Sequence, residues 1–207
     1  LANPDLAGRC GLDVNLVLDR SSSIGSLTGV VQGAAQTFVD ALAGTGSRVR
    51  TVSFANLATA HPFGGVGVTA LDALTWSNVD DYEVPSLTAG GGTNVADGLE
   101  VARRAPGPQA QLTVLFTDGQ PNGHLGASPD GHPGPYVNRG HSRDEAIVEA
   151  NLLKSQGSHL FAIGVGAVDE AVLQELTGPD ALGPGVSITA ADYAQASSLG
   201  QLTESFR

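Results

Sequence analysis

The chain has 207 residues, which is enough to bury a large core, and it can form one large domain or two small ones. Its formal net charge is −11 and no cluster of Lys or Arg is present, so we expect neither nucleic acid nor an anionic membrane surface as a partner. The single cysteine, Cys10, excludes a disulfide within the chain, and no apolar run is long enough to insert into a membrane.

The N-terminal part of the chain alternates between strand and helix patterns. An apolar run over 14–18 predicts a strand buried on both faces, and apolar side chains at helical spacing predict a helix over 27–42. A second strand is predicted over 48–54 and a short antiparallel edge strand over 58–63. The irregular stretch that follows contains a short, poorly periodic helix at 71–79.

The middle of the chain continues this alternation. Periodic apolar residues predict a helix over 95–104 and a strand over 111–117. The segment 119–142 is rich in Gly, Pro, Asn and His and has no apolar period, which indicates a long loop of functional importance. A helix with a mixed face is predicted over 143–155.

The C-terminal part is predicted to contain a strand over 160–165, a short helix over 170–176, a last strand over 186–189 and a final helix over 193–206. Strands that alternate with helices in this way predict an α/β fold with a doubly wound, mainly parallel central sheet and helices on both faces.

Domain organisation follows from what the sequence lacks. We find no linker, no change in composition and no internal repeat, so we predict one domain over 1–207. Residues 1–11 are expected to form a lead-in to the first strand.

Three polar segments lie beside the predicted strands and helices. Asp19, Ser21 and Ser23 follow the first strand, Thr93 precedes a helix in a Gly-rich segment, and Asp118 follows the strand over 111–117. In a doubly wound sheet, ligands bind outside the carboxyl ends of the strands where the strand order reverses. Carboxylate and hydroxyl oxygens are ligands for Mg²⁺, Mn²⁺ or Ca²⁺ rather than for zinc or copper. The three segments together therefore indicate one metal site.

Each segment also has a simpler explanation. Ser23 or Ser26 could cap the following helix, Thr93 could cap its own helix, and Asp118 with Gly119 could form an ordinary turn. The occurrence of all three segments in this order, each beside its strand or helix, favours the metal site.

The segments also resemble a known family. Asp-x-Ser-x-Ser, then Thr in Gly-Gly-Thr-Asn, then Asp in Thr-Asp-Gly is similar to the metal-ion-dependent adhesion site of von Willebrand factor type A domains. The resemblance covers nearly the whole chain and includes Phe-Val-Asp-Ala-Leu at Phe38, Val-Ser-Phe at Val52 and Phe-Ala-Ile-Gly-Val-Gly at Phe161. The Cys-Gly-Leu-Asp opening at Cys10 and the Gly-Gly-Thr-Asn segment resemble type A domains of bacterial surface proteins.

The resemblance implies a set of metal ligands. They are the hydroxyls of Ser21, Ser23 and Thr93, which bind directly, and the carboxylates of Asp19 and Asp118, which bind directly or through water. The ion is expected to be Mg²⁺, or else Mn²⁺ or Ca²⁺. The chain departs from many members of the family at Ser22, where they have Gly.

The resemblance also implies a function. An Asp or Glu carboxylate from a partner protein would displace a water on the ion, so the domain is expected to be a metal-dependent adhesion module and not an enzyme. We expect it to be secreted or at the cell surface, as part of a larger bacterial surface protein, and to be monomeric as an isolated domain.

The loop over 119–142 should border the metal site, because it leaves the strand that carries Asp118. His124, Tyr136 and Arg139 are candidates for partner specificity, beside the alternative that this loop contacts nothing. A second metal site made by the histidines of the loop has no zinc-like spacing.

Adhesion has three alternatives: two enzymatic functions and an intracellular adaptor function. A Mg²⁺-dependent phosphohydrolase would need a cation at the site, and only Arg20 lies near these segments in sequence. No Gly-x-Ser-x-Gly motif for a serine hydrolase is present. An intracellular type A adaptor subunit for an ATPase complex would use the same metal site, and flanking domains would distinguish it from a surface protein.

Overall fold

The computed structural model describes residues 1–6, 11–61, 75–123, 139–183, 186 and 190–196, and Cys10 lies outside these ranges. Its strands belong to one seven-stranded sheet. They are β1 (Asp13–Asp19), β2 (Arg48–Phe54), β3 (Ala58–His61), β4 (Ser77–Asn78), β5 (Leu112–Thr117), β6 (His159–Val165) and β7 (Tyr193–Ala196).

The order of the strands is β3-β2-β1-β5-β6-β7, and β4 pairs with β2 outside this path. Neighbours from β2 to β7 run parallel, whereas β3 and β4 run antiparallel to β2. The chain adds β2 on one side of β1 and β5 on the other, so the strand order reverses beside β1. The carboxyl ends of β1 and β5 are therefore neighbours at the reversal point, where ligands bind in folds of this kind.

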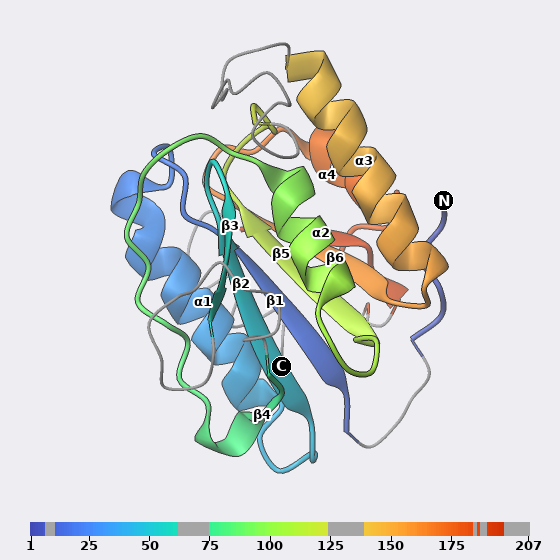
Figure 1. Cartoon of the computed structure of the whole chain (residues 1–207). Helices are drawn as coiled ribbons and strands as arrows, with labels where there is room; N and C mark the ends of the chain where they lie inside the picture. The colour runs from blue at the N-terminus through green and yellow to red at the C-terminus, as the bar shows by residue number, and fades with distance from the viewer. Residues whose placement is uncertain (7–10, 62–74, 124–138, 184–185, 187–189, 197–207) are drawn as a thin grey trace.

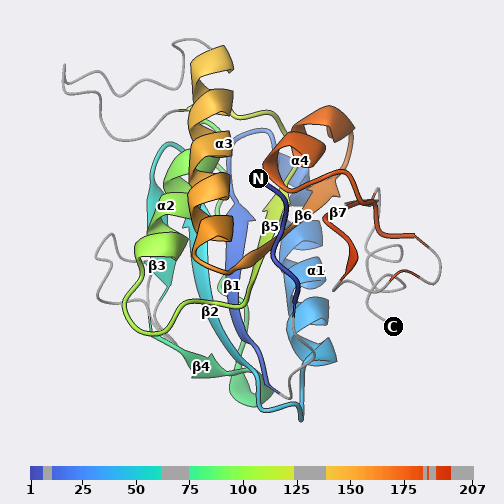
Figure 2. The same cartoon turned by 90° about the vertical axis from the view of Figure 1, so that its right-hand side faces the viewer.

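Helices cover both faces of the sheet, as Figures 1 and 2 show. Among the described residues the α-helices are α1 (Thr28–Ala41), α2 (Val95–Arg104), α3 (Arg139–Ser155) and α4 (Glu170–Leu176). Short 3-10 turns, η1 (Gly25–Leu27) and η3 (Val79–Asp81), lie before α1 and after β4. The α1 side chains belong to one core cluster, and those of α2, α3 and α4 belong to the other. The predicted doubly wound α/β fold is therefore confirmed.

Alternate side chains of a strand point to opposite faces of the sheet, and each face has its own core cluster. In β1, Leu16 and Leu18 contribute to the cluster under α1, and Val17 points to the opposite cluster under α2. All three side chains are fully buried, which explains the continuous apolar run in the sequence. On the α2 side, Gly98 lets the helix approach the sheet, because a Cβ there would lie 2.8 Å from Cδ1 of Phe54.

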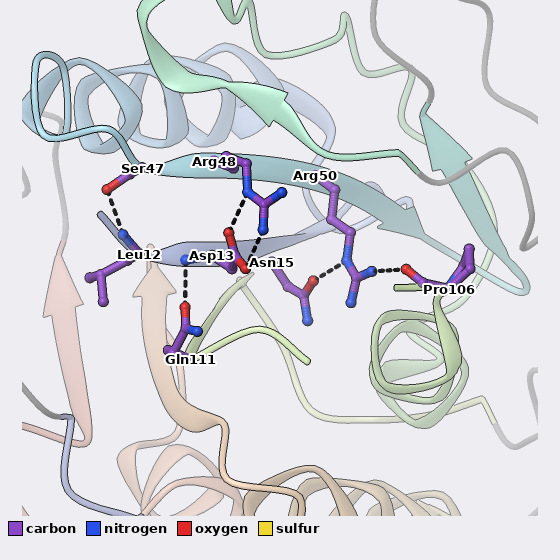
Figure 3. Close-up of polar contacts among 8 residues, drawn as sticks. All are labelled: Leu12, Asp13, Asn15, Ser47, Arg48, Arg50, Pro106 and Gln111. Atoms are coloured by element: carbon purple, nitrogen blue, oxygen red, sulfur yellow. Dashed lines mark hydrogen bonds and ion pairs between the residues drawn. The ribbon is translucent and has the colours of Figure 1, made fainter. Parts of the chain in front are cut away.

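Polar side chains connect β1 to β2 near the amino ends of these strands (Figure 3). Arg48 donates to both carboxylate oxygens of Asp13 at 2.7 Å. The buried Arg50 donates to Oδ1 of Asn15 at 2.6 Å and to the carbonyl of Pro106 at 3.0 Å. Burial lowers the pKa of Arg50 to about 10. This polar cluster stabilises the end of the sheet opposite to the three predicted ligand segments.

Two predicted helices are wrong where the structure describes them. The stretch 71–79 contributes the two-residue strand β4 and the start of η3, because Ser77 and Asn78 pair with β2. The start of the predicted helix 193–206 is strand β7, which pairs with β6 from Ala162 to Val165. Backbone pairing with the open edge of β6 outweighs the helical preference of this Ala- and Leu-containing segment. Residues 197–207 lie outside the described ranges.

The predicted loop 119–142 is also too long. Helix α3 begins at Arg139 instead of Arg143, because its first turn extends beyond the apolar stripe from which the helix was predicted. Residues 124–138 of the loop are not described. In the predicted strand 186–189, Val186 belongs to no strand, and 187–189 lie outside the described residues.

Within the described segments, no helix has both the length and the apolar character needed to cross a bilayer.

Candidate metal centre

Asp19 ends β1 and is fully buried. Its Oδ1 accepts a hydrogen bond from the backbone N–H of Ser21 at 2.8 Å, and its Oδ2 accepts one from the hydroxyl of Thr117 at 2.7 Å. Thr117 is the last residue of β5, so this bond joins the ends of the two strands at the reversal point. The carboxylate is therefore held in one orientation by groups from two elements.

The hydroxyls that follow Asp19 lie next to the carboxylate of Asp118. Ser21 Oγ is 3.0 Å from Ser23 Oγ, and Ser23 Oγ donates to Asp118 Oδ1 at 2.9 Å. Adjacent ligands of an octahedral ion with bonds of about 2.1 Å are separated by about 3.0 Å. Both contacts are hydrogen bonds between the side chains, and their lengths are compatible with neighbouring positions around Mg²⁺.

The loop before α2 lies directly against the loop that follows β1. Ser22 N–H donates to the carbonyl of Gly91 at 3.0 Å, and Gly90 N–H donates to the carbonyl of Arg20 at 2.8 Å. Gly91 has a φ of 80°, and a Cβ there would lie 3.0 Å from the side chain of Asn56. A glycine is needed at this position, since both the backbone conformation and the close approach disfavour a side chain.

Thr93, in the same loop, is 2% exposed. Its N–H donates to Oδ1 of Asn122 at 2.7 Å, and its carbonyl accepts bonds from the N–H groups of Asn122 at 2.9 Å and Gly123 at 3.1 Å. Asn122 and Gly123 belong to the segment that follows Asp118. The structure thus connects all three predicted ligand segments by hydrogen bonds.

The capping explanations for these residues do not hold. Leu27 occupies the N-cap of α1 without a side-chain bond, so neither Ser23 nor Ser26 caps this helix. The N-cap of α2 is Asn94, whose side chain accepts from the N–H of Asp97, so Thr93 does not cap it.

Burial changes the acidity of both carboxylates. Desolvation raises the pKa of Asp19 from 3.8 to about 6, although the hydrogen bonds from Ser21 and Thr117 act in the opposite direction. The nearby charge of Asp118 adds to the increase. Burial also raises the pKa of Asp118, while the hydrogen bond from Ser23 lowers it. A divalent cation would favour the ionised form of both groups.

The donor set fits a hard cation. It consists of two carboxylates and several hydroxyls, and oxygen donors of this kind suit Mg²⁺, Mn²⁺ or Ca²⁺. In the part of the chain that is described, no three His, Cys, Asp or Glu side chains gather into a group that could hold a metal. The described residues thus offer nothing typical of a zinc site.

Sequence reasoning missed two residues beside the site. Thr117 was quoted within the Thr-Asp-Gly motif but was given no role at the site. Asn122 had no signal of its own, because its partner Thr93 is distant in sequence.

The residues predicted to set partner specificity are only partly placed. His124 and Tyr136 lie outside the described residues, and so does the side chain of Arg139, whose backbone begins α3.

A comparison with models of protein families shows to which family the chain belongs. Residues 13–204 match the von Willebrand factor type A domain. The chain belongs to this family. A search of curated proteins found no match to this type A domain.

Solved structures with the same fold come from several organisms. The PilB minor pilin from Streptococcus sanguinis has a TM-score of 0.61 and 18% identity, over 97% of this chain and 60% of the pilin. The pilus adhesin SpaC from Lactobacillus rhamnosus GG has a TM-score of 0.62 and 16% identity, over 99% of this chain and 30% of the adhesin. Manganese-loaded TRAP protein from Plasmodium vivax has a TM-score of 0.58 and 18% identity, over 96% of this chain and 72% of TRAP.

At these identities the likeness concerns the fold alone. This type A domain spans less than two thirds of the pilin and of the adhesin.

Proposed function

We propose that this type A domain is a metal-dependent protein-binding module, in which a divalent cation bridges to an acidic side chain of a partner protein. The observation that carries the proposal is the chain of contacts from Ser21 Oγ to Ser23 Oγ at 3.0 Å and from Ser23 Oγ to Asp118 Oδ1 at 2.9 Å. These residues lie in segments that hydrogen bonds join to those of the buried Asp19 and Thr93. We propose Mg²⁺ as the ion, or else Mn²⁺ or Ca²⁺, because carboxylate and hydroxyl oxygens are ligands for these cations.

The number of protein ligands supports a role for an external carboxylate. The candidate side chains are Asp19, Ser21, Ser23, Thr93 and Asp118. They supply at most five of the six positions of an octahedral ion, and only two of them are charged. Asp19 also shares its charge with two hydrogen-bond donors. An ion held in this way keeps an exchangeable water and enough positive charge to attract a carboxylate.

The candidate ligands differ in burial, and this difference indicates the side from which a partner can reach the site. Asp19 and Thr93 lie in the interior, whereas Ser23 is exposed and Asp118 is half-buried. A partner would therefore approach from the side of Ser23 and Asp118. In this arrangement Asp19 and Thr93 anchor the ion, and the outer residues border the position that the partner completes.

The positions of the Arg and Lys side chains favour a protein-binding module over a phosphohydrolase. Arg20, the one cation near the ligand segments in sequence, donates to the hydroxyl of Thr59 on β3 at 3.4 Å. Other basic side chains have partners on other elements: Arg103 pairs with Glu149 and Lys154 bonds to the carbonyl of Leu176. We therefore propose a binding module and not a phosphohydrolase.

We further propose that the domain acts outside the cell or at its surface. The support comes from its fold neighbours, which include a minor pilin and a pilus adhesin, and from an acidic chain with a single lysine. The domain would then form one part of a longer surface protein.

Titration calorimetry tests the metal centre. The protein, freed of metal with EDTA, is titrated with Mg²⁺ and Mn²⁺ beside two variants, Asp19→Ala and Asp40→Ala. Asp40 is exposed on α1 and serves as the matched control. One site that disappears only in Asp19→Ala would support the proposal. Absence of binding in the unmodified protein, or equal binding by all three proteins, would refute it.

A second experiment tests the open position. Water proton relaxation is measured on the Mn²⁺-loaded protein while acetate is added as a stand-in for an acidic side chain. Acetate should displace the water on the ion and lower the relaxation rate, and the uncharged analogue acetamide should not. A relaxation rate that stays constant with acetate would contradict the bridging mechanism.

A further inference from the structure

Asn122 lies outside the five candidate ligands, yet it contacts the backbone of one of them on both sides. Its Oδ1 accepts from the N–H of Thr93 at 2.7 Å, and its own N–H donates to the carbonyl of Thr93 at 2.9 Å. One residue thus satisfies both backbone polar groups of Thr93. Buried backbone groups need such partners, and Thr93 is 2% exposed.

The segment that follows Asp118 packs closely against the loop that carries Thr93 at a second residue, Gly123. Gly123 N–H also donates to the carbonyl of Thr93, at 3.1 Å. A Cβ on Gly123 would lie 2.8 Å from the Cβ of Asn94, so the backbone at 123 packs directly on the Thr93 loop. The segment after Asp118 therefore holds the backbone of Thr93 in a fixed position relative to the carboxyl end of β5.

The other side of the Thr93 loop is anchored by the turn between β2 and β3. Gly92 N–H donates to Oδ1 of Asn56 at 2.6 Å, and Asn94 N–H donates to the carbonyl of Ala55 at 2.8 Å. The residues on both sides of Thr93 are thus held by the turn that follows β2, and Thr93 itself is held by Asn122.

We propose that Asn122 is a positioning residue that holds Thr93 in place before an ion binds, and that this makes the site prefer a small octahedral cation to a larger one. Selectivity between Mg²⁺ and Ca²⁺ depends on the size and flexibility of the ligand cage. Because these bonds hold the backbone of Thr93, its hydroxyl has less freedom to move outward toward the longer bonds of Ca²⁺. Residues that hold metal ligands typically change metal affinity by about 10- to 100-fold when removed.

This inference rests on the proposed metal centre. A purely structural role for Asn122 would lower the stability of the fold but would leave the ratio of Mg²⁺ to Ca²⁺ affinity unchanged. The ratio is therefore the decisive quantity.

The test measures Mg²⁺ and Ca²⁺ dissociation constants by calorimetry for four proteins: the unmodified domain, Asn122→Ala, Asn122→Asp and Asn78→Ala. Asn78 is a matched control, because its side chain also accepts from a backbone N–H but lies on β4. We expect Asn122→Ala to weaken Mg²⁺ binding about tenfold and Ca²⁺ binding much less. Asn122→Asp keeps an acceptor for the N–H of Thr93 and should restore the preference for Mg²⁺.

Amide hydrogen exchange gives a test that does not depend on the folding of a variant. In the unmodified, metal-free protein the N–H of Thr93 should already be protected, because its acceptor is in place. Free exchange at this amide would overturn the inference, and so would an unchanged affinity ratio in Asn122→Ala. If the unmodified protein binds Mg²⁺ in those cases, the metal centre stands and only the role of Asn122 is refuted. If it binds neither ion, both are refuted.

Discussion

Replacing Asp19 by Asn is expected to stabilise the metal-free domain at neutral pH while it removes metal binding. The carboxylate is fully buried, and two hydrogen bonds compensate only part of the cost of burying its charge. An asparagine in the same position keeps an acceptor for the N–H of Ser21. Its amide group can donate to the hydroxyl of Thr117, which can turn to accept.

The magnitude follows from the pKa. Burial raises the pKa of Asp19 from 3.8 to about 6, and a difference of one unit corresponds to about 1.4 kcal/mol. The ionised carboxylate therefore costs the metal-free fold on the order of 3 kcal/mol at neutral pH. Because the folded pKa lies above the unfolded value, this cost is absent below pH 3.8 and is fully present once the pH has risen through about 6.

Urea unfolding in EDTA measures this difference. Between about pH 5 and about pH 8, the free energy of unfolding of the unmodified protein should fall relative to that of Asp19→Asn. Added Mg²⁺ should stabilise the unmodified protein at about pH 8 and lose its effect near pH 5, because protons then compete for the same carboxylate. The variant should not respond to Mg²⁺ at any pH.

Equal stability of the two proteins in EDTA at neutral pH would refute this reasoning. So would Mg²⁺ stabilisation that is as large near pH 5 as near pH 8. Asp40→Asn, on the exposed surface of α1, provides the control and should show neither effect.

Three further substitutions separate the metal site from the rest of the fold. Thr117→Val removes the hydroxyl that donates to Asp19, so calorimetry should show Mg²⁺ affinity reduced about tenfold, and an unchanged affinity would contradict this role. Arg50→Met leaves its buried amide partner on β1 unsatisfied and should lower the free energy of unfolding by about 2 kcal/mol in urea, whereas altered Mg²⁺ affinity would contradict its placement at the far end of the sheet (Figure 3). Gly98→Ala places a Cβ 2.8 Å from Cδ1 of Phe54 and should cost about 2 kcal/mol in the same assay, so a variant of unchanged stability would show that α2 can move away from the sheet.

Several elements could be predicted from the sequence because their signals are local. The strand at 48–54 and the helices at 95–104 and 170–176 have the predicted bounds, since each combines a clear apolar period with a recognisable end. The doubly wound fold predicted from this alternation would bring Asp19 and Asp118 together if their strands were neighbours, and the structure makes β1 and β5 neighbours.

The prediction failed where the partner of a segment decides its conformation. The segment that begins at Tyr193 has residues compatible with a helix, but it lies beside the open edge of β6 and forms β7. Ser77 and Asn78 form β4 for the same reason, because β2 offers them backbone partners. Neither edge is visible in the local sequence.

The sequence by itself determined the chemistry of the candidate site: which oxygen donors follow which strand, and that they suit a hard divalent ion. Only the tertiary structure decided how these donors are held. Thr117 reaches Asp19 across 98 positions in sequence, and Asn122 reaches Thr93 across 29. The raised pKa of Asp19 likewise comes from burial by elements that are distant along the chain. Donor type is a property of single residues, whereas orientation, burial and acidity depend on neighbours that come together only when the sheet has formed.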